Sequence, residues 1–250
     1  MQSSPTSRDL NEDRVLVILC TYNEAPNIRL MIEAIHEEVP RADILVVEDN
    51  SPDGTGRIVD ELMLTLPFLK VMHRAGKLGL GTATRAGLWQ AVEEEYTFAV
   101  VLDADFSHHP AYMPSLIDAM DRADVAVGSR YVEGGGVVGW SWKRHAMSRL
   151  INFWARLMLG LSTLDNSGSY RCYRVSLLRK IDFSRFKAKG YAIQEELMYR
   201  CRVAGARFVE VPIVFEDRVR GASKITSREG YTAVYLMLNF GLKRLFGIQP

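Results

Sequence analysis

The chain has 250 residues, of which 48% are hydrophobic and 24% charged, and its formal net charge at pH 7 is +1. This balance excludes a collagen-like or low-complexity chain, and it gives no global basic charge, so we expect no nucleic-acid partner. The length suits one α/β domain with a sizeable core. The three cysteines, Cys20, Cys172 and Cys201, form neither a disulfide framework nor a zinc pattern, which favours a reducing compartment.

Residues 1–13 are polar and lack the apolar segment of a signal peptide, so we expect a disordered leader. Apolar runs then alternate with segments of helical spacing. We expect strands at Val15–Cys20, Ile44–Val47, Leu69–Met72 and Phe98–Leu102. We expect helices at Asn27–Val39, after Thr55, and at Thr82–Val92. This order predicts a doubly wound, Rossmann-like α/β sheet with a nucleotide crevice at the carboxyl ends of its strands.

The pattern loosens after the glycine run at 134–136, which indicates a flexible loop. Beyond it we expect a strand at Phe208–Phe215 and helices at Ser148–Leu161, Gly190–Tyr199 and Gly230–Phe246. Pro212 places the strand at a sheet edge or at a bulge. The last helix is apolar on nearly all sides, but Lys243 and Arg244 interrupt it too soon for a transmembrane span.

Two carboxylates, Asp103 and Asp105, stand directly after the fourth expected strand. Because the carboxyl ends of parallel strands meet at one edge of a sheet, both side chains can turn toward one cation. Carboxylate oxygens suit Mg²⁺ or Mn²⁺, which take their remaining ligands from water and substrate phosphates. The other interpretation is a solvated turn, where aspartate is common. The position at the end of a buried strand favours the metal site.

Polar clusters also follow the first and second expected strands. Asp49 lies where an acidic residue can bind a base or a ribose, whereas Asp53 is explained equally well as a helix cap. Tyr22 can stack on a base, although a single tyrosine at such a place is more often part of the core.

Further along, His108 and His109 have no third histidine at ligand spacing, which favours a packing or orienting role. Glu196, in the helix expected near the crevice, either contacts sugar hydroxyls or lies on a solvated face.

Several basic residues suit phosphate. Arg130 follows a short apolar run, Val125–Val127, and is expected to point into the crevice, where a guanidinium can hold phosphate through two hydrogen bonds. Its alternative is a surface salt bridge. Lys143 and Arg144 lie beside Trp142, an arrangement typical of a lipid-phosphate surface, although Lys143 also fits a solvated helix start. A mobile cationic loop is expected around Arg218, Arg220, Gly221, Ser223 and Lys224.

Eight segments together carry a family resemblance. They are T-Y-N-E (Thr21–Glu24), V-E-D-N-S-P-D-G-T (Val47–Thr55), K-L-G-L-G-T-A (Lys77–Ala83), D-A-D-F-S-H-H-P (Asp103–Pro110), G-S-R-Y (Gly128–Tyr131), G-W-S-W-K-R (Gly139–Arg144), S-G-S-Y-R-C-Y (Ser167–Tyr173) and D-R-V-R-G-A-S-K (Asp217–Lys224). With them the chain resembles the dolichyl- and polyprenyl-phosphate mannose synthases, which are inverting family 2 glycosyltransferases of the GT-A fold. The resemblance extends from Val15 to about Lys224, and its later segments are the specific part.

The resemblance implies one GT-A domain at 14–228, with a mixed, mostly parallel sheet that helices flank. A C-terminal helix at 229–250 then contacts a membrane or a partner. Many relatives carry transmembrane helices after this domain, and the chain has no room for them before Pro250. We therefore expect a soluble form that is peripheral on the cytoplasmic face of a membrane, with a membrane-anchoring protein as a possible partner.

The resemblance also implies roles for single residues. The metal-binding positions are Asp103, Asp105 and Ser107, the last standing where some relatives have glutamine. The acceptor-phosphate positions are Arg130, Arg144 and Ser148. The catalytic positions are Asp105, Arg130 and Arg144. The positions for the nucleotide sugar are Cys20, Tyr22, Glu24, Val47, Asp49, Asp103, Ala104, Asp105, Arg130, Arg218 and Lys224. Relatives usually have proline at the position of Cys20.

The expected reaction is metal-dependent, inverting transfer of mannose from GDP-mannose to a polyprenyl phosphate, with Mg²⁺ or Mn²⁺ as cofactor. One alternative is a polyprenyl-phosphate glucosyl- or N-acetylglucosaminyltransferase that uses a UDP-sugar. Transfer to a growing glycan is a second alternative, which the basic and aromatic residues around Arg144 disfavour. A non-catalytic nucleotide-sugar-binding subunit is the third, and it would be expected to lose an acidic metal ligand or the cationic loop.

Overall fold

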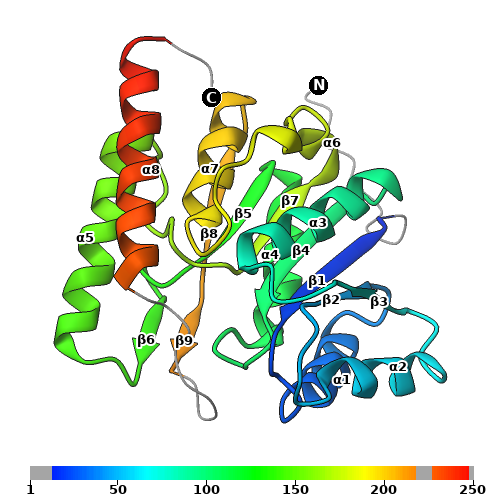
Figure 1. Cartoon of the computed structure of the whole chain (residues 1–250). Coiled ribbons are helices and arrows are strands. Elements are labelled where there is room, and N and C mark those ends of the chain that lie inside the picture. Colours follow the sequence, from blue (N-terminus) through cyan, green and yellow to red (C-terminus); the bar gives the residue numbers. More distant parts are fainter. Residues whose placement is uncertain (1–12, 218–226, 248–250) are drawn as a thin grey trace, which may run out of the picture.

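A seven-stranded sheet forms the centre of the computed structural model, which describes residues 13–217 and 227–247 (Figure 1). The strands lie in the order β3-β2-β1-β4-β7-β5-β8. Their bounds are β1 (Val15–Thr21), β2 (Asp43–Glu48), β3 (Leu69–His73), β4 (Phe98–Asp103), β5 (Val125–Ser129), β7 (Arg171–Arg174) and β8 (Phe208–Pro212). Every neighbouring pair is parallel except the two pairs that β7 forms, with β4 and with β5. The expected mixed, mostly parallel sheet is confirmed.

Helices cover both faces of this sheet. Their bounds are α1 (Ile28–Glu38), α2 (Thr55–Met63), α3 (Leu80–Glu93), α4 (Met113–Asp118), α5 (Trp142–Leu159), α6 (Val175–Leu178), α7 (Ile193–Val203) and α8 (Ser227–Leu245). Short 3₁₀ turns lie at Pro110–Tyr112, Ala119–Asp121 and Phe183–Arg185. One core lies under α1, α2 and α4, and the other under α3, α6 and α7 together with the buried sides of α5 and α8.

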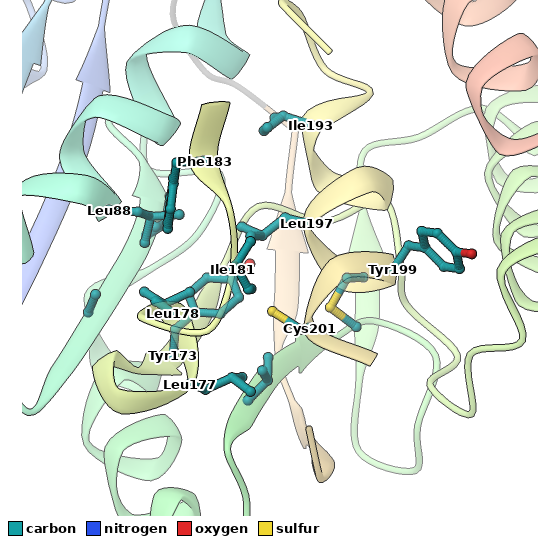
Figure 2. Packing of buried hydrophobic residues seen from close by; sticks show 14 of the residues in the cluster. Leu88, Tyr173, Leu177, Leu178, Ile181, Phe183, Ile193, Leu197, Tyr199 and Cys201 are labelled. Atoms are coloured by element: carbon teal, nitrogen blue, oxygen red, sulfur yellow. The ribbon is translucent and has the colours of Figure 1, made fainter. Parts of the chain in front are cut away.

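The strand β1 explains why the first apolar run is continuous. Val15, Val17 and Leu19 belong to one core, whereas Leu16 and Ile18 belong to the other. Successive side chains of a strand point to opposite faces, so a strand that is covered on both sides needs apolar residues throughout. Figure 2 shows the second core, where Leu178 and Ile181 pack with Leu197 and Cys201 of α7.

The second half of the chain differs from the sequence pattern in two strands. The pattern does not predict β7, which lies in the middle of the sheet. Phe208–Phe215 is not one strand, because it divides into β8 and β9 (Val214–Glu216), and β9 pairs with β6 (Gly136–Val138) in a separate two-stranded sheet. Pro212 ends β8, which is an edge strand as expected.

Several helices begin at other residues than expected, among them α5, α7 and α8, the last of which begins at Ser227 rather than Gly230. α5 begins at Trp142 rather than Ser148, because Ser141 caps it by accepting a hydrogen bond from the Arg144 backbone N–H. α7 begins at Ile193, and the expected helix at Gly190 therefore starts three residues too early. α5 and α8 pack side by side at one end of the molecule (Figure 1).

Across the described ranges, no helix is long and apolar enough to cross a membrane. Asp13 is the part of the expected leader that the structure describes, and its side chain is buried. The expected cationic loop with Arg218 and Lys224 lies outside the described residues.

Candidate active site

The carboxyl ends of β2, β1 and β4 meet at one edge of the sheet. In the pairing register, Cys20 of β1 stands opposite Val47 of β2 on one side and opposite Asp103 of β4 on the other. The Asp49 backbone N–H then donates to the carbonyl oxygen of Thr21, at 3.1 Å. The convergence expected from the polar clusters is therefore present, and it follows directly from parallel pairing.

The positions expected for the nucleoside lie at this edge. Tyr22 is half-buried, and the Lys77 ammonium lies 4.3 Å from the centre of its ring. The Glu24 carboxylate is buried and accepts a hydrogen bond from the Asn27 amide at 2.9 Å. Val47 is fully buried.

The thiol of Cys20 is an inert part of the same edge. Burial raises its pKa to about 12, and its Sγ lies 3.6 Å from the hydroxyl of Thr84. A thiol of this kind stays protonated at neutral pH and acts as a packing group.

The carboxylate of Asp49 holds the loop that precedes α3. One oxygen accepts from the Arg74 guanidinium at 2.5 Å, and the other accepts from the backbone N–H groups of Leu78 and Gly79 at 3.1 Å each. Arg74 is absent from the residues that the sequence predicted for the site. Its position directly after β3 is the signal that would have found it, because the ends of parallel strands converge.

Asp53 lies just before α2, whose N-cap residue is Gly54. Its Oδ1 accepts from both the backbone N–H and the hydroxyl of Thr55, at 3.0 and 2.6 Å, and its Oδ2 accepts from the Ala25 backbone N–H. These bonds satisfy groups at the start of α2, as the capping interpretation expects, although the N-cap position itself is Gly54.

Asp103 and Asp105 lie just beyond β4, and they differ in their surroundings. The Asp103 side chain retains 26% exposure, whereas Asp105 is buried and its Oδ1 accepts from the Ser107 backbone N–H and hydroxyl, at 3.0 and 2.6 Å. Ala104 between them is buried. The Nδ1 of His108 lies 3.5 Å from Asp103 Oδ2.

His108 is buried between Tyr170 and Phe215, with ring centres at 5.5 and 5.2 Å, and neither ring nitrogen has a hydrogen-bond partner in the structure. His109 instead accepts from the Ala111 backbone N–H through Nδ1. The expected packing role therefore suits His108, whereas His109 is exposed and caps the 3₁₀ turn at Pro110–Tyr112.

Asp103 and Asp105 fit a divalent cation that takes most of its ligands from water and from substrate phosphates. No cluster of three or more His, Cys, Asp or Glu side chains that could hold a metal ion occurs in the parts of the chain that the structure describes. Mg²⁺ and Mn²⁺ bind in many phosphate sites through one or two carboxylates and complete their shell with water and phosphate. The Asp103 and Asp105 pair offers that kind of site.

A cavity of about 420 Å³ begins at Asp103 and extends toward α5 and α8. Its walls are polar near the sheet and apolar between the two helices. The residues that line it include Asp103, His108, Arg130, Trp140, Arg144, Met147, Ser148, Ile151, Ser167, Tyr191, Gln194, Glu195, Phe215, Ala233, Val234 and Met237. Arg130, Arg144 and Ser148, which the sequence assigns to the acceptor phosphate, are therefore brought together with Asp103. Cys20, Tyr22, Glu24, Val47 and Asp49 are not among its lining residues.

Arg130 is the most tightly held cation of the cavity. Its Nε and Nη2 each donate to a different oxygen of Asp165 at 2.6 Å, and Nη2 also donates to the Ser167 hydroxyl at 3.0 Å. Burial opposes the charge of both groups. Even so, the pair raises the pKa of Arg130 and lowers that of Asp165, because each charge stabilises the other. The expected alternative of a surface salt bridge is wrong, since the pair is buried.

Arg144 and Ser148 lie one turn apart on α5. The Arg144 guanidinium is 4.2 Å from the centre of the Trp140 ring and donates to Asp217 at 2.7 Å. The Tyr131 hydroxyl donates to Ser148 Oγ at 2.7 Å. The Arg144 pair is half-exposed, so this guanidinium is held more loosely than that of Arg130.

The solvated-face interpretation of Glu196 is wrong, and its side chain does not line the cavity. It is buried, and its carboxylate accepts from the backbone N–H groups of Lys187 and Ala188 and from the Arg200 guanidinium. The neighbouring Gln194 and Glu195 line the cavity instead. Helical spacing alone did not establish where α7 begins, and it therefore did not indicate that Glu195 rather than Glu196 lines the cavity.

The family follows from comparison of the sequence with known proteins. The model of glycosyl transferase family 2 matches residues 16–182. The chain belongs to glycosyl transferase family 2. This family 2 chain is 43% identical over 232 residues to the polyprenol monophosphomannose synthase of Mycolicibacterium smegmatis, and the alignment covers 92% of this chain and 88% of the relative. It is 41% identical over 229 residues to the undecaprenyl-phosphate mannosyltransferase of Micrococcus luteus, with coverage of 92% and 94%.

Solved structures share the fold of this family 2 chain. The glucosyl-3-phosphoglycerate synthase of Mycobacterium tuberculosis, in complex with Mn²⁺, UDP and phosphoglyceric acid, superposes with a TM-score of 0.64 at 18% identity and covers 96% of this chain and 81% of its own. A mannosyltransferase of Pyrobaculum calidifontis, in complex with GDP-Man and Mn²⁺, superposes with a TM-score of 0.55 at 16% identity, with coverage of 94% and 74%. The GT-A-like fold is thus confirmed.

Proposed function

We propose that this chain transfers a mannosyl group from GDP-mannose to a polyprenyl phosphate, with inversion at the anomeric carbon. The observation that carries the proposal is a continuous cavity that runs from Asp103 past Arg130, Arg144 and Ser148 to an apolar wall on α5 and α8. A polar end suits a sugar diphosphate, a basic middle suits a phosphate monoester, and an apolar end suits a prenyl chain. Two relatives above 40% identity are named as mannose-transferring enzymes with prenyl-type acceptors.

The donor occupies the edge formed by β2, β1 and β4. Tyr22, Glu24 and Asp49 are proposed to form the nucleoside side of the site, with Asp49 acting through the loop that it holds. The backbone at Ala104 passes close to the nucleotide. Arg218 and Lys224 are proposed to close over the diphosphate.

Asp103 and Asp105 would hold Mg²⁺ or Mn²⁺ against the donor diphosphate. When bound, such an ion stabilises the negative charge that develops on the leaving diphosphate. Ser107 is proposed to support the site through Asp105, because its hydroxyl donates to that carboxylate.

The acceptor needs little activation, because a phosphate monoester has a second pKa near 6 and is largely ionised at neutral pH. The main task of the protein is to hold two anions close together and in line for displacement. Arg144 and Ser148 are proposed to bind the acceptor phosphate. Arg130, fixed by Asp165, supplies a positive charge at a constant position between the two anions.

The acceptor lipid also requires access to a membrane. α5 and α8 each carry a stripe of exposed apolar side chains, which we call the α5–α8 surface: Leu150, Phe153 and Leu157 on α5, and Tyr231, Tyr235, Leu238 and Leu242 on α8. Exposed cations accompany it at Lys143, Arg149 and Arg156. Apolar and basic side chains on neighbouring helices suit an anionic lipid surface, so we propose that this surface lies on the membrane from which the acceptor enters.

The test uses Arg144→Ala, with Arg29→Ala as the control, because Arg29 is an exposed arginine on α1 and lies outside the α5–α8 surface. Formation of mannosylated lipid from GDP-mannose and polyprenyl phosphate is expected to fall about 10- to 100-fold in Arg144→Ala, because a charged hydrogen bond to the acceptor is lost. GDP affinity, measured by titration calorimetry, is expected to stay within about twofold.

An unchanged rate with weakened GDP binding would contradict the acceptor role of Arg144. A wild-type chain that forms lipid-linked sugar from a UDP-sugar but not from GDP-mannose would overturn the proposed donor.

A further inference from the structure

The start of α7 presents two polar side chains to the cavity that the reaction above does not use. Gln194 and Glu195 both line the cavity, and their exposures are only 3% and 6%. Buried polar groups are normally hydrogen-bonded, because an unmet donor or acceptor costs about 1–3 kcal/mol. The Gln194 Nε2 group is buried and has no hydrogen-bond partner in the structure. An unmet donor in a cavity wall indicates a missing ligand atom.

The orientation of the Gln194 amide is fixed by a neighbour. Arg171 is fully buried in β7. Its Nη1 donates to the backbone carbonyl oxygen of Gln194 at 2.8 Å and to the side-chain Oε1 of the same residue at 3.1 Å. A guanidinium can only donate, so the amide oxygen must face Arg171 and the NH₂ group must point away from it. Gln194 therefore offers a donor and Glu195, one residue on, offers carboxyl oxygens.

The charge at this wall selects the kind of ligand. A carboxyl group offers a phosphate no positive charge and repels it when ionised, so neither the donor diphosphate nor the acceptor phosphate belongs beside Glu195. A neutral group with hydroxyls can both accept from an amide N–H and donate to a carboxyl oxygen. Between the diphosphate at Asp103 and the acceptor phosphate at Arg144, the one neutral polyhydroxyl group of the reaction is the hexose.

We propose that Gln194 and Glu195 bind hydroxyl groups of the transferred hexose and so help to select it. This inference rests on the proposed function. Burial raises the pKa of Glu195 to about 7, so near neutrality its carboxyl can both donate to and accept from a hydroxyl. Arg171 acts as a positioning residue, because it orients Gln194 without lining the cavity.

The experiment compares two ligands that differ only in the hexose. Titration calorimetry in the presence of Mn²⁺ measures the affinities of wild type, Glu195→Leu and Gln194→Leu for GDP-mannose and for GDP. Glu37→Leu, the same change on the exposed side of α1, is the matched control. Each site variant is expected to bind GDP-mannose about tenfold more weakly than wild type, with GDP affinity unchanged within about twofold.

Equal weakening for both ligands would indicate a structural role for α7 and would overturn the inference. Unchanged GDP-mannose affinity in both variants would also overturn it, while leaving the proposed reaction in place. Failure of the wild-type chain to form mannosylated lipid would overturn the proposed function and this inference with it. Thermal unfolding of each variant shows that the titrations use folded protein.

Discussion

At the scale of single residues, Glu195 makes the stability of the fold depend on pH. Burial raises its pKa from the ordinary value of 4.5 to about 7, Arg171 offsets part of that effect, and Asp165 adds to it. Between these two pH values the folded chain binds more protons at this carboxyl than the unfolded chain does. Its contribution to the free energy of unfolding therefore falls as pH rises through the window, and it is constant above it.

Glu195→Gln removes this titration. From pH 5 to pH 8 the wild-type chain is expected to lose about 2 to 3 kcal/mol of unfolding free energy through this carboxyl, and the variant is expected not to show that loss. Urea unfolding at the two pH values measures the difference, and Glu37→Gln serves as the control. Parallel pH dependence in wild type and Glu195→Gln would contradict the raised pKa.

Single residues also differ in how far the sequence could predict them. Arg130 was predictable because it follows an apolar strand and arginine suits phosphate. Its partner Asp165 was not, because the two are 35 residues apart and no local pattern connects them. Removing one partner of a buried ion pair destabilises the fold by several kcal/mol, because the other charge stays buried without its partner. The sequence thus indicated a cation at the site but not the carboxylate that fixes its position.

At the scale of elements, the central strand β7 is the clearest limit of sequence pattern. Its four residues include two arginines, yet Arg171 is fully buried. The charge is accommodated because the guanidinium donates to the carbonyl oxygens of Asn166 and Gln194, contacts that form only in the folded chain. β1 and β4 were predictable because burial on both faces requires an uninterrupted apolar run.

The α5–α8 surface leads to a prediction about membranes. Leu242→Ser is expected to weaken binding to anionic vesicles about threefold or more, because it removes one apolar side chain that is 54% exposed. Leu64→Ser is the matched control, since Leu64 is a still more exposed leucine at the end of α2. Cosedimentation with vesicles containing phosphatidylglycerol measures both. An equal loss in both variants would contradict a specific docking surface.

At the scale of the whole molecule, donor binding and folding stability are linked. Any ligand that binds only the folded chain raises the free energy of unfolding, by about 2.7 kcal/mol at 100 times its Kd. For a chain of this size, GDP with Mn²⁺ at that excess is expected to raise Tm by roughly 5–10 °C. Differential scanning calorimetry with Mn²⁺ or with EDTA separates the contribution of the metal.

The rise in Tm on adding GDP is expected to be several degrees smaller in EDTA than in Mn²⁺. Asp103→Asn is expected to show the smaller rise under both conditions. Equal shifts of the wild-type chain with Mn²⁺ and with EDTA would contradict metal-assisted donor binding at Asp103 and Asp105.

The position of β7 has a consequence for biosynthesis. β4 ends at Asp103, but its neighbour on that side, β7, begins only at Arg171. During translation the apolar β4 is complete long before the strand that covers its second edge has been made. An uncovered apolar strand edge is a site where other chains can pair. The seven-stranded sheet can therefore form in full only after the chain beyond Arg174 has left the ribosome.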